Sequence, residues 1–330
     1  MHLSFWVTLL ITFQSTDNIH FAKFKSIDLS SDYPISVIEQ VDVDKSGNIL
    51  ITDSTTGSVY LYTMSEESFK KLDSRECHPG FNHQPIRTVF TGSEIWMMHA
   101  HSQVFRFSVQ GECIGAIDSF FSVPHLFGGS IETSLAGFSP YNFNLNKPVI
   151  NLYSEEAETI KQIDLNSQII APNMSFRFLG GGIIARDSTI YLATSSSPAI
   201  YEIKDVAVTK HLPEISGVTY NVNDDLNPGN RTLIAEIDRY RNTYTTVRNF
   251  FSLNDEYLAL SIVSTVDSNE GLLLFNLNNK SFPYPIHEFT KSQYIDYVYN
   301  NKAYIFMEDT TRENIDWVIN VYNIDFTLSD

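Results

Sequence analysis

Basic residues, cysteines and long apolar segments are all scarce in this 330-residue chain. Lysine and arginine number 22 against 39 aspartates and glutamates, which gives a net charge of −17. No basic patch interrupts this acidic field, so the chain repels polyanions and we expect no nucleic-acid partner. Beyond the first 13 residues no stretch is long and apolar enough to cross a bilayer, so we expect no transmembrane segment.

The chain has only two cysteines, Cys77 and Cys113. They could pair in an exported protein, but two buried free thiols are the more common arrangement. The sequence therefore favours free thiols and leaves a disulfide open.

Motifs of common enzymes are also missing. No Gly-x-Ser-x-Gly sequence occurs, so the nucleophile turn of the α/β-hydrolases is absent. Gly180-Gly181-Gly182 precedes an expected strand, whereas a phosphate-binding loop precedes a helix. These glycines instead predict an inner strand whose backbone lies close to the central axis of the fold.

The first residues differ from the rest of the chain. An apolar run ends at Phe13, and the polar segment Gln14–Asn18 follows it. This order is typical of a secretory signal peptide, although His2 stands where Lys or Arg is usual; a buried leading strand is the alternative. We expect a leader over residues 1–18, a single domain over residues 19–330, and a secreted or periplasmic protein.

What the chain does contain is a repeat of short strands rich in β-branched and aromatic residues. In each repeat, polar turns separate strands that alternate apolar and polar side chains. The second strands of the repeats lie 41 to 67 residues apart and begin at Asn48, Glu94, Pro148, Thr189, Glu256 and Lys302. About four strands per 40–50 residues predict an all-β fold, a six-bladed β-propeller.

The strand count leaves one strand missing at the C-terminal end and one strand unpaired at the N-terminal end. The last repeat lacks a fourth strand, whereas Phe21–Leu29 reads as an isolated strand without a partner nearby. We therefore predict that the N-terminal strand completes the last blade, which hides sheet edges that would otherwise be open.

The first repeat carries a resemblance to a known group. Asp42-x-Asp44-x-x-Gly47-Asn48-Ile-Leu-Ile-Thr-Asp53, followed by Val59-Tyr-Leu-Tyr62, resembles the blade pattern of NHL-type and TolB-like propellers. From about Phe21 onward the chain is similar to bacterial exported six-bladed β-propeller proteins. The resemblance implies export and a six-bladed ring, and it implies no catalytic residue because no enzyme motif matches.

Several side chains are candidates for binding a ligand. Arginine presents a planar donor fork that suits acidic or carbohydrate ligands, although salt bridges with the many acids are the alternative. The arginines near expected inner strands are Arg87, Arg177, Arg239, Arg241 and Arg248. Trp96, Tyr141 and the insertion Leu212–Arg231 are further candidates, because aromatic residues and long loops carry recognition.

Metal ligands are weaker candidates. His99 and His101 project from the same face of a strand, but no third ligand is evident. Asp42, Asp44 and Asp53 have spacings that resemble a calcium loop, yet this segment reads better as a hairpin turn between two strands.

Two functions from different classes follow. The first is a binding or scaffold propeller, monomeric and without a cofactor, that recognises a protein or glycan through one face or its axial funnel. The alternative is a calcium-dependent hydrolase or lactonase with a metal on the axis, for which the candidate ligands are Asp42, Asn142, Asp187, Asp238 and Asp296. A structural module within a larger assembly is a third possibility.

Overall fold

The computed structural model is all-β, and almost every pairing is antiparallel between strands that follow each other in the chain. It describes residues 19–29, 35–53, 55–81, 85–99, 103–118, 126–129, 135–142, 147–153, 159–165, 181–186, 188–194, 197–205, 207–214, 243–263, 270–282, 287–289, 297–309 and 316–326. The expected leader, residues 1–18, lies outside these ranges.

Three four-stranded sheets follow in chain order. The first contains β2 (Ile38–Val43), β3 (Ile49–Asp53), β4 (Ser58–Thr63) and β5 (Ser68–Leu72). The second contains β6 (Pro85–Phe90), β7 (Glu94–His99), β8 (Gln103–Ser108) and β9 (Cys113–Asp118). The third contains β10 (Leu126–Gly129), β11 (Leu135–Asn142), β12 (Lys147–Tyr153) and β13 (Thr159–Asp164).

An eight-stranded sheet comes next and consists of two four-stranded runs. The first run is β14 (Gly181–Arg186), β15 (Thr189–Thr194), β16 (Ile200–Lys204) and β17 (Ala207–His211). The second is β18 (Thr246–Ser252), β19 (Tyr257–Val263), β20 (Glu270–Asn276) and β21 (His287–Phe289). A parallel bridge between Gly181 and Asn249 joins the two runs.

The last sheet joins the two ends of the chain. Its order is β22 (Tyr297–Tyr299), β23 (Lys302–Asp309), β24 (Asp316–Phe326) and β1 (Ile19–Leu29). β1 pairs antiparallel with β24 from Ile19 opposite Phe326 to Leu29 opposite Trp317. The predicted pairing of the N-terminal strand with the last strand is therefore present.

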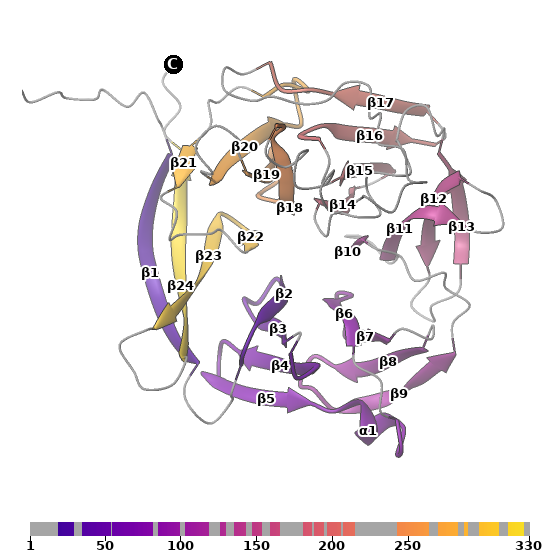
Figure 1. The fold of residues 1–330 in the computed structure, drawn as a ribbon, viewed down its shortest axis with the longest axis vertical. Helices are drawn as coiled ribbons and strands as arrows, with labels where there is room; N and C mark the ends of the chain where they lie inside the picture. Colours follow the sequence, from indigo (N-terminus) through magenta and orange to yellow (C-terminus); the bar gives the residue numbers. More distant parts are fainter. Residues whose placement is uncertain are drawn as a thin grey trace, which may run out of the picture.

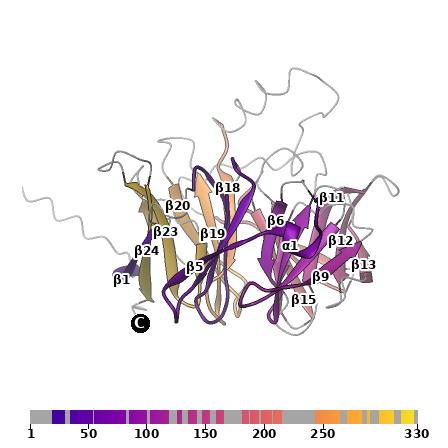
Figure 2. The same cartoon turned by 90° about the horizontal axis from the view of Figure 1, so that it is seen from below.

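The sheets follow one another in a ring around a common centre (Figure 1), and their strands run from one face of this ring to the other (Figure 2). The strands nearest the centre are the first of each four-stranded run; we call β2, β6, β10, β14, β18 and β22 the inner strands. Among the described residues no helix is long and apolar enough to span a membrane.

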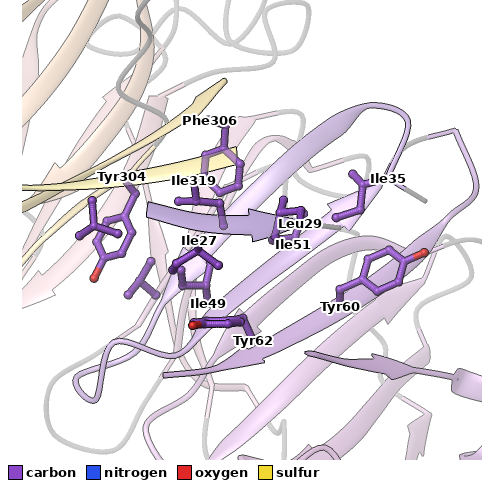
Figure 3. Packing of buried hydrophobic residues seen from close by; sticks show 12 residues of the cluster. Ile27, Leu29, Ile35, Ile49, Ile51, Tyr60, Tyr62, Tyr304, Phe306 and Ile319 are labelled. Atoms are coloured by element: carbon purple, nitrogen blue, oxygen red, sulfur yellow. The ribbon is translucent and has the colours of Figure 1, made fainter. Parts of the chain in front are cut away.

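The hydrophobic core lies between neighbouring sheets. Each buried cluster takes side chains from two consecutive four-stranded groups. One cluster joins the last sheet to the first: Ile27 and Leu29 of β1 and Phe306 of β23 pack against Ile49 and Ile51 of β3 (Figure 3). Because β3 is covered on both faces, its Ile-Leu-Ile run is buried throughout instead of alternating.

The strand predictions missed one described strand. The sequence did not indicate β10, whose four residues include two glycines and carry little strand signal. The fourth strand of the fifth repeat was expected over Phe282–Ile286, and residues 283–286 lie outside the described ranges; the fourth described strand of that run is β21, which starts at His287.

The expectation of free thiols was also wrong, because Cys77 and Cys113 form a disulfide. The short helix α1 (Ser74–Cys77) is capped by Asp73, whose carboxylate accepts from the backbone N–H of Arg75. This turn brings Cys77 beside β9, where its Cα lies 5.4 Å from that of Cys113, a normal distance for a bridge. The bond fastens the connection after the first sheet to the outermost strand of the second.

Candidate functional site

The inner strands β2, β6 and β22 meet at the side chain of Asp42. Its Oδ1 accepts a hydrogen bond from the Tyr297 hydroxyl at 2.6 Å and from the Val43 N–H at 3.0 Å. Its Oδ2 accepts from the Phe90 N–H at 2.7 Å. One carboxyl group thus links the first sheet to the second and to the last.

Gln40, two residues earlier on β2, makes a second link to β6. Its Nε2 donates to the Thr88 carbonyl oxygen at 3.1 Å, and its Oε1 accepts from the Thr88 N–H at 3.2 Å. Gln40 and Asp42 project from the same face because side chains alternate along a strand. Their side-chain hydrogen bonds connect β2 and β6, two inner strands that belong to different sheets.

Burial dominates the electrostatics around Asp42. The residue keeps some surface exposure, but protein surrounds its carboxyl group, and this burial raises its pKa to about 6 despite the three hydrogen bonds. Burial together with the Asp42 charge raises the pKa of Tyr297 well above its ordinary value. Burial, Asp44 and Asp42 also raise the pKa of Tyr299. At neutral pH, Tyr297 is therefore the hydrogen-bond donor to an ionised Asp42.

The segment that resembles a calcium loop is a hairpin turn, as predicted. Asp44 Oδ1 accepts from the N–H groups of Ser46 and Asn48 at 2.8 and 2.9 Å, and Gly47 has a φ of +83°. Asp53 accepts from the N–H groups of Ser36 and Thr55, each at 2.9 Å. These carboxylates shape loops at opposite ends of β2 and β3, so they do not converge on one ion.

Arg186, at the end of β14, reaches the turn that follows β18. Its Nη1 donates to the Asp255 carbonyl oxygen at 2.9 Å and its Nη2 to Ser252 Oγ at 2.6 Å; Nη2 also donates to the Asn254 carbonyl oxygen. The guanidinium therefore joins the two runs of the eight-stranded sheet. These acceptors are carbonyl and hydroxyl oxygens, whereas the alternative stated for the other arginines was a salt bridge, and the sequence analysis had not singled out Arg186.

Trp96, a predicted contact residue, and His99, a candidate ligand, are both buried and form no surface contact site. Each is 1% exposed, and they lie on opposite faces of the second sheet. Trp96 packs with Tyr153 of the third sheet, and its Nε1 donates to Glu94 Oε2 at 3.2 Å. The His99 ring meets the edges of Phe81 and Phe105, with centroids 4.7 and 5.0 Å away. The neighbouring residues on β7 are apolar, so the strand is buried on both faces and both side chains lie in the core.

The other candidates are located only in part. Arg87 lies on inner strand β6, and Tyr141 and Asn142 lie at the end of β11, but their side chains are not described. Arg248 is half-buried at an irregularity of β18, between Val247 and Asn249. The candidates outside the described residues are His101, Arg177, Arg239, Arg241, Asp187, Asp238 and Asp296.

The residues that sequence reasoning missed are partners across the ring. Tyr297 lies 255 positions from Asp42, and Gln40 lies 48 positions from Thr88. No local pattern marks them. The one usable signal was the period of the repeat, which places Gln40, Asp42 and Tyr297 on inner strands.

No protein-family model matches the chain, and no curated protein matches it either. Solved structures do resemble it. A Bacteroides fragilis NCTC 9343 protein expected to be exported superposes with a TM-score of 0.60 at 10% identity, over 94% of this chain and 95% of that one.

Two further structures resemble the chain at low identity. A streptogramin B lyase gives a TM-score of 0.50 at 12% identity, over 95% of this chain and 89% of that one. A chain of the mitotic checkpoint complex gives 0.51 at 7% identity, over 98% of each. At such identities the likeness shows the fold alone, and the fold that it shows is a β-propeller.

Proposed function

We propose that this chain is an exported six-bladed propeller of the NHL or TolB-like type, which binds a protein or glycan partner as a monomer and catalyses no reaction. The blade count is supported by four separate four-stranded sheets and two four-stranded runs in the fifth. Closure is supported by the β1–β24 pairing and by the cluster that joins the last sheet to the first.

Export is supported by the bond between Cys77 and Cys113. Disulfides persist in oxidising compartments such as the periplasm or the extracellular space and are rare where thiols are kept reduced. The proposal assigns residues 1–18 to a leader that directs the chain there.

The observation that carries the choice of binding over catalysis is the engagement of Asp42. Its two oxygens already accept hydrogen bonds from Tyr297, Val43 and Phe90, and these bonds hold three sheets together. A calcium ion that bound both oxygens of this carboxylate would compete with those donors, and each buried N–H that lost its acceptor would cost about 1–3 kcal/mol. Asp42 is therefore a poor candidate for a calcium ligand, which disfavours the alternative hydrolase.

The proposal places recognition where β17 is connected to β18. Residues 212–245 are the longest stretch of sequence between two consecutive described strands, and long connections on a rigid scaffold commonly carry binding. Arg239 and Arg241 remain candidate contacts in this stretch, and Tyr141 at the end of β11 remains a further candidate. In this view the sheets supply the rigid support and the connection supplies the specificity.

A pull-down from the native envelope fraction and a glycan array test this proposal. We expect a captured ligand whose affinity falls at least tenfold, about 1.4 kcal/mol, when Asn221–Asn230 is replaced by a Gly-Ser linker of equal length. The matched control is Lys45→Ser in the β2–β3 turn, at the other end of the strands, which should leave binding unchanged. Equal loss in both variants would contradict the assignment of the surface.

Thermal unfolding with calcium and with EDTA separates the two functions. The binding proposal predicts the same midpoint in both solutions, whereas a calcium-dependent enzyme would be stabilised by its ion. A calcium-induced rise that disappears in Asp42→Asn would refute the binding proposal in favour of the hydrolase.

A further inference from the structure

The connection between β5 and β6 runs along the outside of the ring, where α1 lies beside β9 (Figure 1). Its backbone hydrogen bonds are local. Glu76 N–H donates to the Asp73 carbonyl oxygen and His78 N–H to the Ser74 carbonyl oxygen, each at 3.0 Å. None of the α1 residues is buried. The turn is thus folded on itself and contributes no side chain to the core.

The disulfide attaches this turn to the second sheet. It bonds Cys77 to Cys113 at the start of β9. Cys77 Sγ also lies 3.8 Å from the Arg106 carbonyl oxygen on β8, but a bridged sulfur has no proton to donate. Within the described part of the chain, no other polar contact joins residues 74–80 to a sheet. The position of α1 therefore depends on the bond between the two sulfurs.

Both ends of the connection are held independently of that bond. Leu72, at the end of β5, and Phe81 are 3% and 8% exposed, and both belong to the cluster between the first and second sheets. The Phe81 ring also contacts His99 and Phe105, with centroids 4.7 Å away in each pair. Breaking the disulfide would free the residues between these two anchors and leave the anchors in place.

The disulfide lies where a thiol can approach it. Both cysteines are half-buried, whereas the neighbouring residues Glu76, His78 and Ile114 are exposed. β9 is also the outermost described strand of its sheet. Exposed disulfides exchange with thiols more readily than buried ones do. This bond can therefore be reduced while the chain is folded.

The ring does not need the disulfide to stay closed. β9 pairs with β8 up to Cys113 itself, which lies opposite Phe107. On the inner side of the ring, Gln40 and Asp42 accept and donate hydrogen bonds that reach β6. None of these contacts involves sulfur, so the first and second sheets remain joined when the disulfide is open.

We propose that the bond between Cys77 and Cys113 is a redox switch, which sets whether residues 73–80 are held against the second sheet or released from it. A dithiol reductant supplies both electrons. One of its thiolates attacks a sulfur of the bridge and forms a mixed disulfide, and its second thiolate then displaces the protein thiolate. The reductant leaves as a disulfide, and the two cysteines take up the two protons that it gave up.

In an oxidising compartment the closed state is the resting state, and a reductant opens it. The switch goes beyond the proposed function, because it does not depend on what the chain binds. A failure to find a partner would leave it unaffected.

Limited trypsin digestion of the folded chain tests the switch, because Arg75 is the one trypsin site within residues 73–80. The disulfide should protect the peptide bond after Arg75. Reduction with dithiothreitol should raise the cleavage rate there about tenfold or more, since a native disulfide restrains open forms by at least this factor. Cleavage after Arg106, on β8, should keep its rate.

Two results would overturn the proposal. An unchanged rate after Arg75 would mean that the turn stays in place without the bond. Equal acceleration after Arg75 and Arg106 would mean that reduction opens the whole sheet. Thiol titration adds a further condition: if no free cysteine appears until urea unfolds the chain, the bond is not switchable and the proposal is refuted.

The matched control is the double variant Cys77→Ser, Cys113→Ser. It should be cleaved after Arg75 as fast as the reduced parent, with or without dithiothreitol. Hydrogen exchange of the parent needs no variant. The N–H groups of Glu76 and His78 should lose protection on reduction and regain it on reoxidation, while those of β7 stay protected. Protection that does not respond to reduction would contradict the switch.

Discussion

A single added methyl group at Gly181 tests how closely β14 lies to its neighbours. This glycine has a φ of +86°, and a Cβ built on it would lie 2.2 Å from the Ala193 carbonyl oxygen on β15. Gly92, in the turn between β6 and β7, has a nearly identical φ of +89°, but its Cβ would meet nothing within 4 Å. The two sites therefore share the backbone strain and differ in the contact.

The magnitudes follow from these two terms. An L-residue in the left-handed region costs about 1–2 kcal/mol, which is the whole effect that we expect for Gly92→Ala. At Gly181 a contact of 2.2 Å against backbone cannot be relieved by rotating a side chain, so β14 must shift. Overpacking of this kind costs about 1–3 kcal/mol more, which brings Gly181→Ala to roughly 2–5 kcal/mol.

Urea denaturation of both variants, followed by tryptophan fluorescence, measures the difference. Gly182→Ala adds a second point, because its Cβ would lie 2.9 Å from the Phe250 carbonyl oxygen on β18 and so strains the junction of the two runs without a positive φ. If Gly181→Ala and Gly92→Ala lose the same stability, the close approach of β14 is not a constraint and the reasoning fails.

Three further predictions concern links between neighbouring four-stranded groups. Replacing Cys77 and Cys113 by serine should cost about 4 kcal/mol for a separation of 36 residues, or about 5 °C in calorimetry of a chain of this size. Arg186→Ala should cost roughly 2–3 kcal/mol in urea unfolding, because it removes charged hydrogen bonds to the turn after β18. Glu202→Gln should destabilise the parent at pH 7 but not well below pH 4, because Lys280 and His211 offset the burial of Glu202 and lower its pKa.

Each of these predictions has a control and an opposing outcome. Dithiothreitol should lower the midpoint of the parent to that of the cysteine variant and leave the variant unchanged; an unaffected parent would contradict the role of the disulfide. Arg186→Lys keeps the charge without the fork and should recover less than half of the loss. For Glu202→Gln, a penalty that is as large at pH 3 as at pH 7 would show that lost packing, not charge, is responsible.

The fold was predictable because its signals are local and repeated. The first repeat shows why: Asp44, Gly47 and Asn48 form a turn with their own side chains and backbone, and the strands on either side alternate in a recognisable way. Where these signals fail, the prediction failed too. β10 is only four residues long, and two of its residues are glycines.

The contacts around the inner strands were not predictable in the same way. Trp96 was a candidate contact as an aromatic residue and His99 a candidate ligand by its spacing from His101, yet both are in the core. Whether such a side chain faces the core depends on which sheet lies beside its own, and sequence spacing within one strand does not contain that information. The same holds for Tyr297, which becomes the partner of Asp42 only when the ring brings β22 beside β2.

The junctions between sheets show two physical solutions to one problem. β14 and β18 touch through backbone at Gly181 and Asn249, a Cβ at Gly182 would lie 2.9 Å from the Phe250 carbonyl oxygen on β18, and Arg186 joins the ends of the two strands. β2 and β6 carry side chains at the equivalent place, so Gln40 and Asp42 span the gap and satisfy the backbone of Thr88 and Phe90. The β14–β18 contact is made by backbone groups, whereas the side-chain junction contains the Asp42 carboxyl group, whose pKa burial raises to about 6. Acidification from pH 7.5 to 5 should therefore strengthen the contacts of β2 and leave the junction of β14 and β18 unchanged, a difference that hydrogen exchange of the two segments can measure.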